Sequence, residues 1–549
     1  MEKSTKDKQL QTSIAGGKLF NFRPVFFIAV FLAIGIAFAY FYLLYGVSLW
    51  WSVCLLPVVC VPFFYCRSAI RAKRILLAAF TLVIAFFIGF SLFTARVNAL
   101  LDAGIYDGEY VAVGRVVGKE KTDKGWRLTL EDVYIDGKEE DGQIIAYVSE
   151  QSGQTVKLSD ELVLKGDIST QSEFFNDYGF ASEAVGGGVR YYMWTDDYVV
   201  TGHKIDIFLA VRERIQTVLY AGMDETPAAA TVAVLTGDTS GMESGLLKNI
   251  RYGGVAHIFA VSGLHIGALF GACVGFIKKT KLRKTPKLVQ FLLVAGVLLF
   301  YGGVCGYSPS VIRAITMCMV LYASKLIGIG SDALENVGAS AVLVLLLSPT
   351  SLFEVGFQLS YAACIGIIVL AAPMQRAAYA IGGALFGKKL ERNTDAPLTL
   401  TQSAVRSIVS FLSVTFAAQI FTAPILLYSF GYLSVWSLLL NCIFVPLIGV
   451  VFSALLLMAF VMCLLPVAIA KYVLFLPNVL LTAVLLFFEI FDFSLVAFSG
   501  WRLTWSAFAC YYLAWSFATD KWNLSRELRA LLFTVCAVGC VLTTVVVNI

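Results

Sequence analysis

The sequence has few charged residues and almost no histidine. Only 14% of its 549 residues are Asp, Glu, Lys or Arg, whereas 58% are hydrophobic, and the mean hydropathy is +0.79. A soluble protein of this length cannot bury so much apolar surface, so the composition predicts a polytopic α-helical membrane protein. Three histidines in the whole chain leave almost no room for a multi-histidine metal site.

Cysteine is missing from the one long polar region, because all twelve cysteines lie in or beside apolar segments. The sequence therefore predicts neither a disulfide framework nor a thiolate metal cluster. It also contains no Walker motif, no HExxH sequence and no histidine-rich metal motif. We expect no cofactor, no bound metal and no enzymatic activity.

Basic residues near the N-terminus predict the topology. Residues 1–97 are expected to form a lysine-containing cytoplasmic tail and three transmembrane helices, near 24–45, 49–65 and 75–95. The loop between the second and third helices holds three arginines and a lysine within Arg67–Arg74. Under the positive-inside rule the tail and this loop both face the cytoplasm, so the chain after Ala95 lies outside the cell. The expected location is the cytoplasmic membrane.

Residues 98–204 change character, with short β-prone runs separated by turns. Alternating apolar and polar residues, punctuated by Gly and Asp over about 100 residues, predict a small antiparallel barrel or sandwich. We favour an extracellular OB-like β-barrel inserted into the helical protein. From Asp102 to Asp197 the region holds 20 acidic and nine basic residues, which opposes broad electrostatic capture of a polyanion.

Basic residues of this β-domain cluster around one tryptophan. Such a cluster suits stacking of a single DNA strand, and it equally suits a solvated hairpin, so both interpretations stay open. The candidate DNA-binding residues are Arg115, Lys119, Lys121, Lys124, Trp126 and Arg127.

Residues 205–222 have apolar residues at helical spacing on one side and charges on the other, which predicts an amphipathic helix on the outer membrane surface. Residues 223–549 are expected to form a multi-helix membrane domain. Within it, KKTKLRKTPK carries six basic residues from Lys278 to Lys287 and marks a cytoplasmic loop. Further spans are expected near 289–305, 310–327, 335–348, 353–372, 405–428, 433–465, 468–490, 503–518 and 529–547.

The apolar stretch 255–276 carries His257, Ser262 and His265. Polar groups are costly in hydrocarbon, so these residues should face a partner helix or a water-filled path. On one continuous helix all three can share a face. Gly263 and the flanking glycines would let another backbone approach or let the helix unwind. Packing glycines with histidines bonded to neighbouring helices remain the alternative.

Other polar residues interrupt the later apolar segments. Gly302, Gly303, Gly306 and Pro309 are expected to break the helix ahead of Arg313, and broken backbone at membrane depth requires protein or a cavity around it. A purely structural hydrogen-bond network between helices is the alternative. Together with His257, Ser262, Gly263 and His265, the candidate substrate path comprises Tyr307, Ser310, Arg313, Gln358, Ser360, Gln419 and Asn441.

Several of these residues lie in motifs that resemble the ComEC family of competence proteins. HIFAVSGLHIG resembles the family signature, and Ser310, Arg313 and Ala314 match its S-x-x-R-A motif. Residues 349–360 resemble its P-x-x-L-F-x-x-G-F-Q-L-S segment. Gln419 with Pro424 and Asn441 with Pro446 match two later motifs. The motifs recur in the family's order, and the resemblance covers roughly residues 30–470.

The resemblance implies a channel that carries one strand of incoming DNA across the cytoplasmic membrane during natural transformation. It implies as partners single-stranded DNA, a DNA receptor and cytoplasmic helicase-like or single-strand-binding proteins, besides the lipid bilayer. Many members carry a C-terminal metallo-β-lactamase-like domain, whereas this sequence has no H-x-H-x-D-H run and no histidine after His265. A separate nuclease is therefore expected to degrade the other strand.

Two other functions stay open. One is a transporter or export channel for another anionic polymer or solute. The other is an intramembrane enzyme that uses Ser262 and His265 as nucleophile and base.

Overall fold

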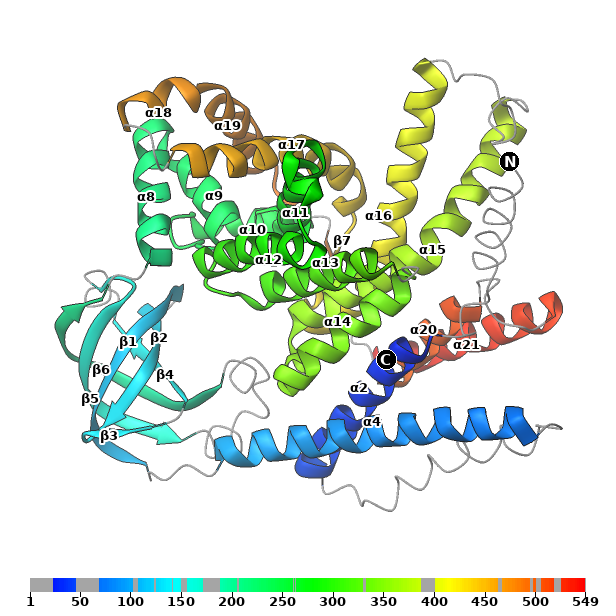
Figure 1. Cartoon of the computed structure of the whole chain (residues 1–549), viewed down its shortest axis with the longest axis horizontal. Coiled ribbons are helices and arrows are strands. Elements are labelled where there is room, and N and C mark those ends of the chain that lie inside the picture. The colour runs from blue at the N-terminus through cyan, green and yellow to red at the C-terminus, as the bar shows by residue number, and fades with distance from the viewer. Residues whose placement is uncertain are drawn as a thin grey trace.

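The fold was analysed in a computed structural model of the chain. The structure describes residues 23–45, 69–101, 107–122, 125–140, 142–149, 156–170, 188–204, 207–259, 261, 263–328, 332–386, 400–462, 467–493, 497–499, 505–517 and 525–548. Helices dominate it, and one sheet lies at the edge of the helical part (Figure 1). The segment expected to span the membrane at 49–65 lies outside the described residues.

The first two described helices, α2 (Pro24–Tyr45) and α4 (Ala69–Leu101), cross at a pair of glycines. A β-carbon on Gly35 would overlap the carbonyl oxygen of Phe86, and one on Gly89 would overlap that of Leu32. Small residues permit such close approach where helices gain little from the hydrophobic effect, as in a bilayer. The N-terminus of α2 also contacts α14 (Ala333–Leu347).

The β-domain is a six-stranded mixed sheet. Its strands are β1 (Gly108–Thr122), β2 (Gly125–Ile135), β3 (Lys138–Glu139), β4 (Gln143–Val148), β5 (Asp160–Thr170) and β6 (Val189–His203). The order is β1-β5-β6-β4-β2-β3, and β1 also pairs with β2, so the pairings of the five longer strands run around a ring. The expectation of purely antiparallel pairing is wrong at one place, because β4 and β6 are parallel.

The β-domain core is filled by the inward positions of every strand except the short β3. Leu128, Leu130, Leu162, Leu164 and Tyr191 are fully buried there. Their alternation with more exposed neighbours is the period-two pattern of half-buried strands.

After the sheet, α8 (Ile207–Gly222) leads into a short helix at the centre of the protein. Helix α9 (Glu225–Thr236) buries every residue from Pro227 to Thr236 and packs between α8, α17 (Ser437–Met462) and α19 (Phe475–Ile490). Side chains of α8, α9, α17 and α19 form part of the largest core cluster. The buried face of α8, with Leu209, Ile215 and Leu219, thus packs on protein.

Most of the remaining helices follow the spans expected from hydropathy, and the short helix at Ser244–Tyr252 was not expected. The remaining helices are α10 (Ser244–Tyr252), α11 (Gly263–Lys279), α12 (Lys287–Val304), α13 (Pro309–Ile327), α15 (Val355–Phe386), α16 (Leu400–Phe430), α18 (Val467–Val473), α20 (Trp505–Phe517) and α21 (Arg526–Asn548), with 3-10 turns η2 (Ala256–Ile258), η3 (Lys281–Lys284) and η4 (Pro349–Phe353). The small strands β7 (Tyr432–Ser434) and β8 (Ala497–Ser499) pair with each other.

Seven helices among the described residues are long and apolar enough to cross a membrane. A multi-pass membrane protein is therefore the architecture that the helices support. One expected span differs in detail, because 468–490 is divided into α18 and α19, with a break near Leu474.

Candidate functional site: a ring of five motif-bearing helices

The signature segment is broken rather than helical throughout. The turn η2 ends at Ile258, and α11 begins only at Gly263. Of the two arrangements that the sequence allowed, one continuous helix with His257 and His265 on one face or unwinding next to the glycines, the structure shows the second. His257 is exposed in η2, whereas His265 is 1% exposed in α11. Ser262 lies outside the described residues.

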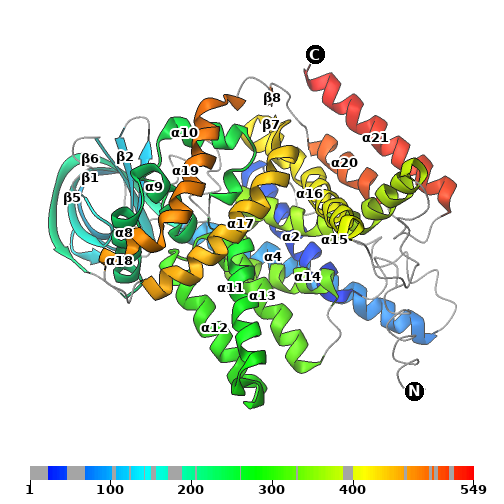
Figure 2. The ribbon, with the colours of Figure 1, turned by 90° about the horizontal axis from the view of Figure 1, so that it is seen from above.

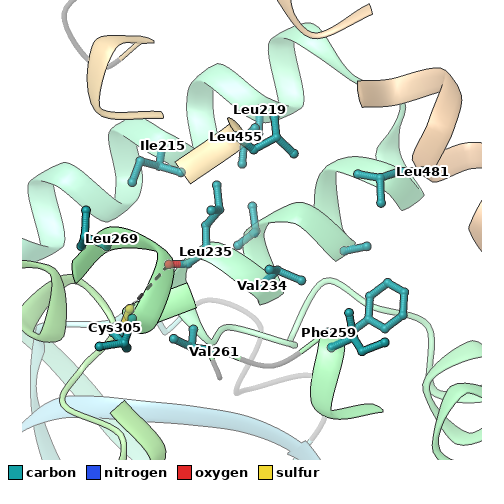
Figure 3. Packing of buried hydrophobic residues seen from close by; sticks show 14 of the residues in the cluster. Ile215, Leu219, Val234, Leu235, Phe259, Val261, Leu269, Cys305, Leu455 and Leu481 are labelled. Carbon is teal, nitrogen blue, oxygen red and sulfur yellow. Dashed lines mark hydrogen bonds between the residues drawn. The ribbon is translucent and has the colours of Figure 1, made fainter. Parts of the chain in front are cut away.

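Neighbouring helices supply hydrogen bonds to the backbone that these breaks leave unpaired. Ser310 Oγ donates to the carbonyl of Val261 at 3.1 Å, inside the broken stretch. Tyr301 Oη donates at 3.0 Å to the carbonyl of Leu235, near the end of α9, and Cys305 Sγ lies 3.5 Å from the same oxygen. Figure 3 shows Leu235, Cys305 and Val261 gathered in this core. Such donors offset the cost of buried, unpaired carbonyl groups.

The chain turns ahead of Arg313 at Gly306 and Pro309, as expected from the sequence. Helix α12 ends with Gly306 and Tyr307 in the left-handed region, at φ 65° and 48°. Their amides bond the carbonyls of Gly303 and Gly302, which is the pattern of a Schellman C-cap. Tyr307 is neither glycine nor asparagine, so this conformation costs free energy that the surrounding structure must offset. Pro309 then starts α13, which carries Arg313.

Arg313 is a buried cation with unmet hydrogen-bonding capacity. Its side chain is 3% exposed, and Nε and Nη1 have no hydrogen-bond acceptor among the described residues. Gly356, at the start of α15, faces it, and a β-carbon there would lie in ordinary contact with Nη2, at 3.4 Å. The Glu354 carboxylate contributes opposite charge nearby, and Ser351 Oγ donates to it at 3.0 Å. The Glu354 charge therefore offsets only part of the cost of burying this cation, and two of its donor atoms have no acceptor among the described residues.

A serine that sequence analysis missed joins two of the predicted residues and the backbone just before η2. Ser437 Oγ accepts hydrogen bonds from Gln419 Nε2 at 2.6 Å and Asn441 Nδ2 at 3.1 Å. It also donates to the carbonyl of Gly254 at 3.5 Å, and the His257 ring bonds the backbone of that glycine. The Ser437 hub therefore ties α16, α17 and the turn before η2 together. In the sequence, the only indication of Ser437 is its position four residues before Asn441, on the same helix face.

The predicted residues meet in a closed circuit of helices. Contacts run from α11 to α13, α15, α16, α17 and back to α11. Figure 2 shows these helices grouped near the centre of the molecule. Each of the five carries at least one predicted residue: Gly263 and His265 on α11, Ser310 and Arg313 on α13, Gln358 and Ser360 on α15, Gln419 on α16, and Asn441 on α17.

Within this ring the side chains differ in exposure and partners. Asn441 is 6% exposed and its Oδ1 has no partner among the described residues. Gln358 Nε2 donates at 3.1 Å to the carbonyl of Leu352 in η4, and Ser360 is half-buried. Gly263 is exposed and approaches Ala314, the neighbour of Arg313. The ring thus contains both structural bonds and unsatisfied polar atoms.

The predicted basic cluster of the β-domain is largely engaged by the protein itself. Arg115 Nη2 lies 3.0 Å from Asp132 Oδ2. Lys119 Nζ donates to the carbonyl of Val156 at 2.7 Å and lies 4.3 Å above the centre of the Trp126 ring. Burial lowers the pKa of Lys119, while the nearby Asp160 and Asp238 act in the opposite direction. Lys124 lies outside the described residues, and Lys121 is described only as backbone of β1.

The outer face of β2, β4 and β6 carries the predicted Arg127 together with aromatic residues that sequence analysis missed. Arg127 pairs with Tyr147 across β2 and β4, and Tyr147 pairs with Trp194 across β4 and β6. The Tyr147 and Trp194 rings are stacked, with centroids 5.6 Å apart. Tyr192 lies beside Trp194, and burial raises its pKa to about 12. Sequence showed the alternation in β4 and β6, but not that these two strands are neighbours.

The sequence matches a protein family and a curated relative. Residues 234–524, a little over half of the chain, match the family described as Competence protein. ComE operon protein 3 of Bacillus subtilis (strain 168) is 27% identical over 238 residues, which cover 43% of this chain and 27% of that protein. The match thus spans about a quarter of the length of this curated relative. No solved structure matches. All five ring helices begin and end inside the matched region, and the chain belongs to the competence protein family.

Proposed function

We propose that this protein is a channel for single-stranded DNA, which passes through the ring of α11, α13, α15, α16 and α17 during natural transformation. The observation that carries the proposal is the ring itself. Five sequence-distant motifs, each with a polar residue in an apolar helix, converge in one circuit of contacts. Polar and ionisable residues in membrane helices mark a substrate path more often than a lipid-facing surface.

Arg313 is the group proposed to meet the phosphates. A buried arginine costs about 2.5–3.5 kcal/mol at the bilayer centre even on lenient scales. Two of its nitrogens have no acceptor among the described residues, and a guanidinium suits the planar geometry of a phosphate. The broken backbone at η2 and at the Gly306–Tyr307 turn supports the proposal, because breaks at membrane depth are tolerated where they are buried in protein or line a cavity and can supply groups that replace hydration.

In this proposal the β-domain lies outside the cell as an OB-like barrel. The ring-like pairing of five strands and the single parallel pair support that comparison. A DNA receptor delivers the substrate, helicase-like or single-strand-binding proteins receive it in the cytoplasm, and a separate nuclease removes the other strand.

The experiment is complementation of a strain that lacks the gene. Wild-type protein should restore transformation by added DNA, whereas Arg313→Gln should restore less than a tenth of it at equal abundance in the membrane. The matched control is Arg376→Gln, which changes an exposed arginine on α15 outside the motifs. Normal transformation of the deletion strain would contradict the proposal, as would full activity of Arg313→Gln.

A further inference from the structure

The β-domain has a pocket at one end of β2, β4 and β6. Its volume is about 720 Å³, and the residues that line it include the stacked Tyr147 and Trp194 and, from the core side of β2, Trp126. Trp194 is 48% exposed, although the Tyr147 ring covers part of it. An exposed tryptophan held in a stack with a tyrosine is already ordered, so a planar ligand that stacks on it loses little side-chain entropy.

The two sides of this pocket carry opposite charges, with Arg127 toward one side and Asp196 on the other. Arg127, Tyr147 and Trp194 form one row across three neighbouring strands, with the cation at one end. Strands lie about 4.8 Å apart, so Arg127 stands roughly 10 Å from Trp194 along the row. On the opposite wall, Asp196 Oδ1 accepts a hydrogen bond from the amide of Ser149 at 2.7 Å. A carboxylate there repels phosphate and accepts N–H donors.

We propose that the pocket beside Tyr147 and Trp194 binds one base of single-stranded DNA, with an adjoining phosphate against Arg127. This inference rests on the proposed function and adds a base-binding site on the β-domain, separate from the helix ring. Neutral, planar bases suit an aromatic pocket with an acidic wall, and the phosphate suits the one basic end of the row. Aromatic stacking with a neighbouring cation is the usual combination in sequence-tolerant strand binding.

The proposed site does not depend mainly on electrostatic attraction between the β-domain and the DNA phosphates. Arg115 and Lys119 are engaged by Asp132 and by the Val156 carbonyl, and the region is acidic overall. Stacking should therefore supply most of the affinity, and only one or a few phosphates should be neutralised. The logarithm of affinity should fall with log salt at a slope of about −0.7 for each phosphate neutralised.

The test measures binding of a short oligothymidine to the purified full-length protein in nanodiscs. Trp194→Ala should weaken binding by about 5- to 150-fold, the range of one lost stack, and leave the salt slope unchanged. Arg127→Gln should instead make the slope shallower by about 0.7. Trp194→Phe should retain most of the affinity. The matched control is Val199→Ala, at an exposed residue of the same strand.

A second measurement needs no variant. Oligonucleotides with 5-iododeoxyuridine, irradiated on the wild-type protein, should crosslink to Trp194 or Tyr147. Crosslinks confined to other residues, or wild-type affinity in Trp194→Ala, would overturn the base-binding site. Displacement by neutral oligosaccharides with no binding of oligothymidine would also overturn it, in favour of a sugar-binding pocket.

Different results would contradict the base-binding site and the channel. Wild-type binding by Trp194→Ala, together with loss of uptake in Arg313→Gln, would remove the pocket and keep the channel. Crosslinks at Trp194 in a protein that restores no uptake to a deletion strain would keep the pocket and remove the channel.

Discussion

The Ser437 hydroxyl accepts a hydrogen bond from Gln419 Nε2 at 2.6 Å, and through it α17 is tied to α16. The same oxygen accepts from Asn441 and donates to Gly254, so its one proton and both lone pairs are used. Two motifs that are 22 residues apart in sequence therefore meet on a residue that belongs to neither.

Ser437→Ala should destabilise the ring. Three buried or half-buried polar groups lose their partner, and each unsatisfied group costs about 1–3 kcal/mol. We expect a lower melting temperature in detergent and faster proteolysis between α16 and α17. Ser413→Ala is the matched control, since among the described residues that buried serine bonds only the Val409 carbonyl of its own helix. Equal stability of the two variants would show that the Ser437 hub is dispensable.

Gly35→Leu and Gly89→Leu should each prevent normal assembly of α2 with α4. A side chain at either position meets the facing backbone, which cannot move as a flexible side chain can. The expected result is loss of folded protein from the membrane, measured by fluorescence-detected size exclusion. Gly296→Leu, where a β-carbon has open space within 4 Å, should fold normally. Normal yields of Gly35→Leu would show that the crossing is looser than the structure indicates.

Arg23 and Asp332 should stabilise the N-terminal helix together. Arg23 Nε and Nη2 donate to the two carboxylate oxygens of Asp332 at 2.8 and 2.5 Å. Burial alone would raise the pKa of Asp332, but hydrogen bonds from Arg23 and from amides of α14 hold it below the ordinary value. The stabilisation is therefore complete above the ordinary pKa of about 3.9 and is lost as the pH falls through the lower folded value.

A double-mutant cycle with Arg23→Gln and Asp332→Asn measures this pair. Because both side chains are partly exposed, we expect a coupling of about 1 kcal/mol near neutral pH. The coupling should vanish in acid, below the folded pKa of the aspartate. A coupling that persists there would mean that charge is not its source.

The β-domain and the KKTKLRKTPK loop should lie on opposite sides of the membrane. Val199 in β6 and Lys284 in η3 are both exposed, so a cysteine at either position is accessible once the reagent reaches that side. In intact cells an impermeant maleimide should label Val199→Cys, and it should label Lys284→Cys only after permeabilisation. Labelling in the opposite order would invert the proposed topology.

Sequence patterns predicted most helices of this protein because hydropathy and length decide them. They also predicted the break ahead of Arg313, since Gly306 and Pro309 act locally. What they missed depends on neighbours far away in the chain. Ser437 is an ordinary residue until Gln419 and Gly254 reach it, and Trp194 is an ordinary strand residue until β4 lies beside β6. The sequence did not decide whether the signature segment is broken, because His257 and His265 would also fit one face of a continuous helix.

The most direct test of the channel is to trap DNA inside it. A photo-crosslinking amino acid at Gln358, on the ring helix α15 that contacts α13, is combined with transforming DNA whose end carries a bulky protein that stalls uptake. The control position is Leu292, an exposed residue of α12 outside the ring. If DNA passes through the ring, stalled single strands should crosslink at 358 and not at 292. Stalled DNA that crosslinks at 292 or nowhere in the protein, while crosslinking to another membrane protein, would contradict passage through this ring.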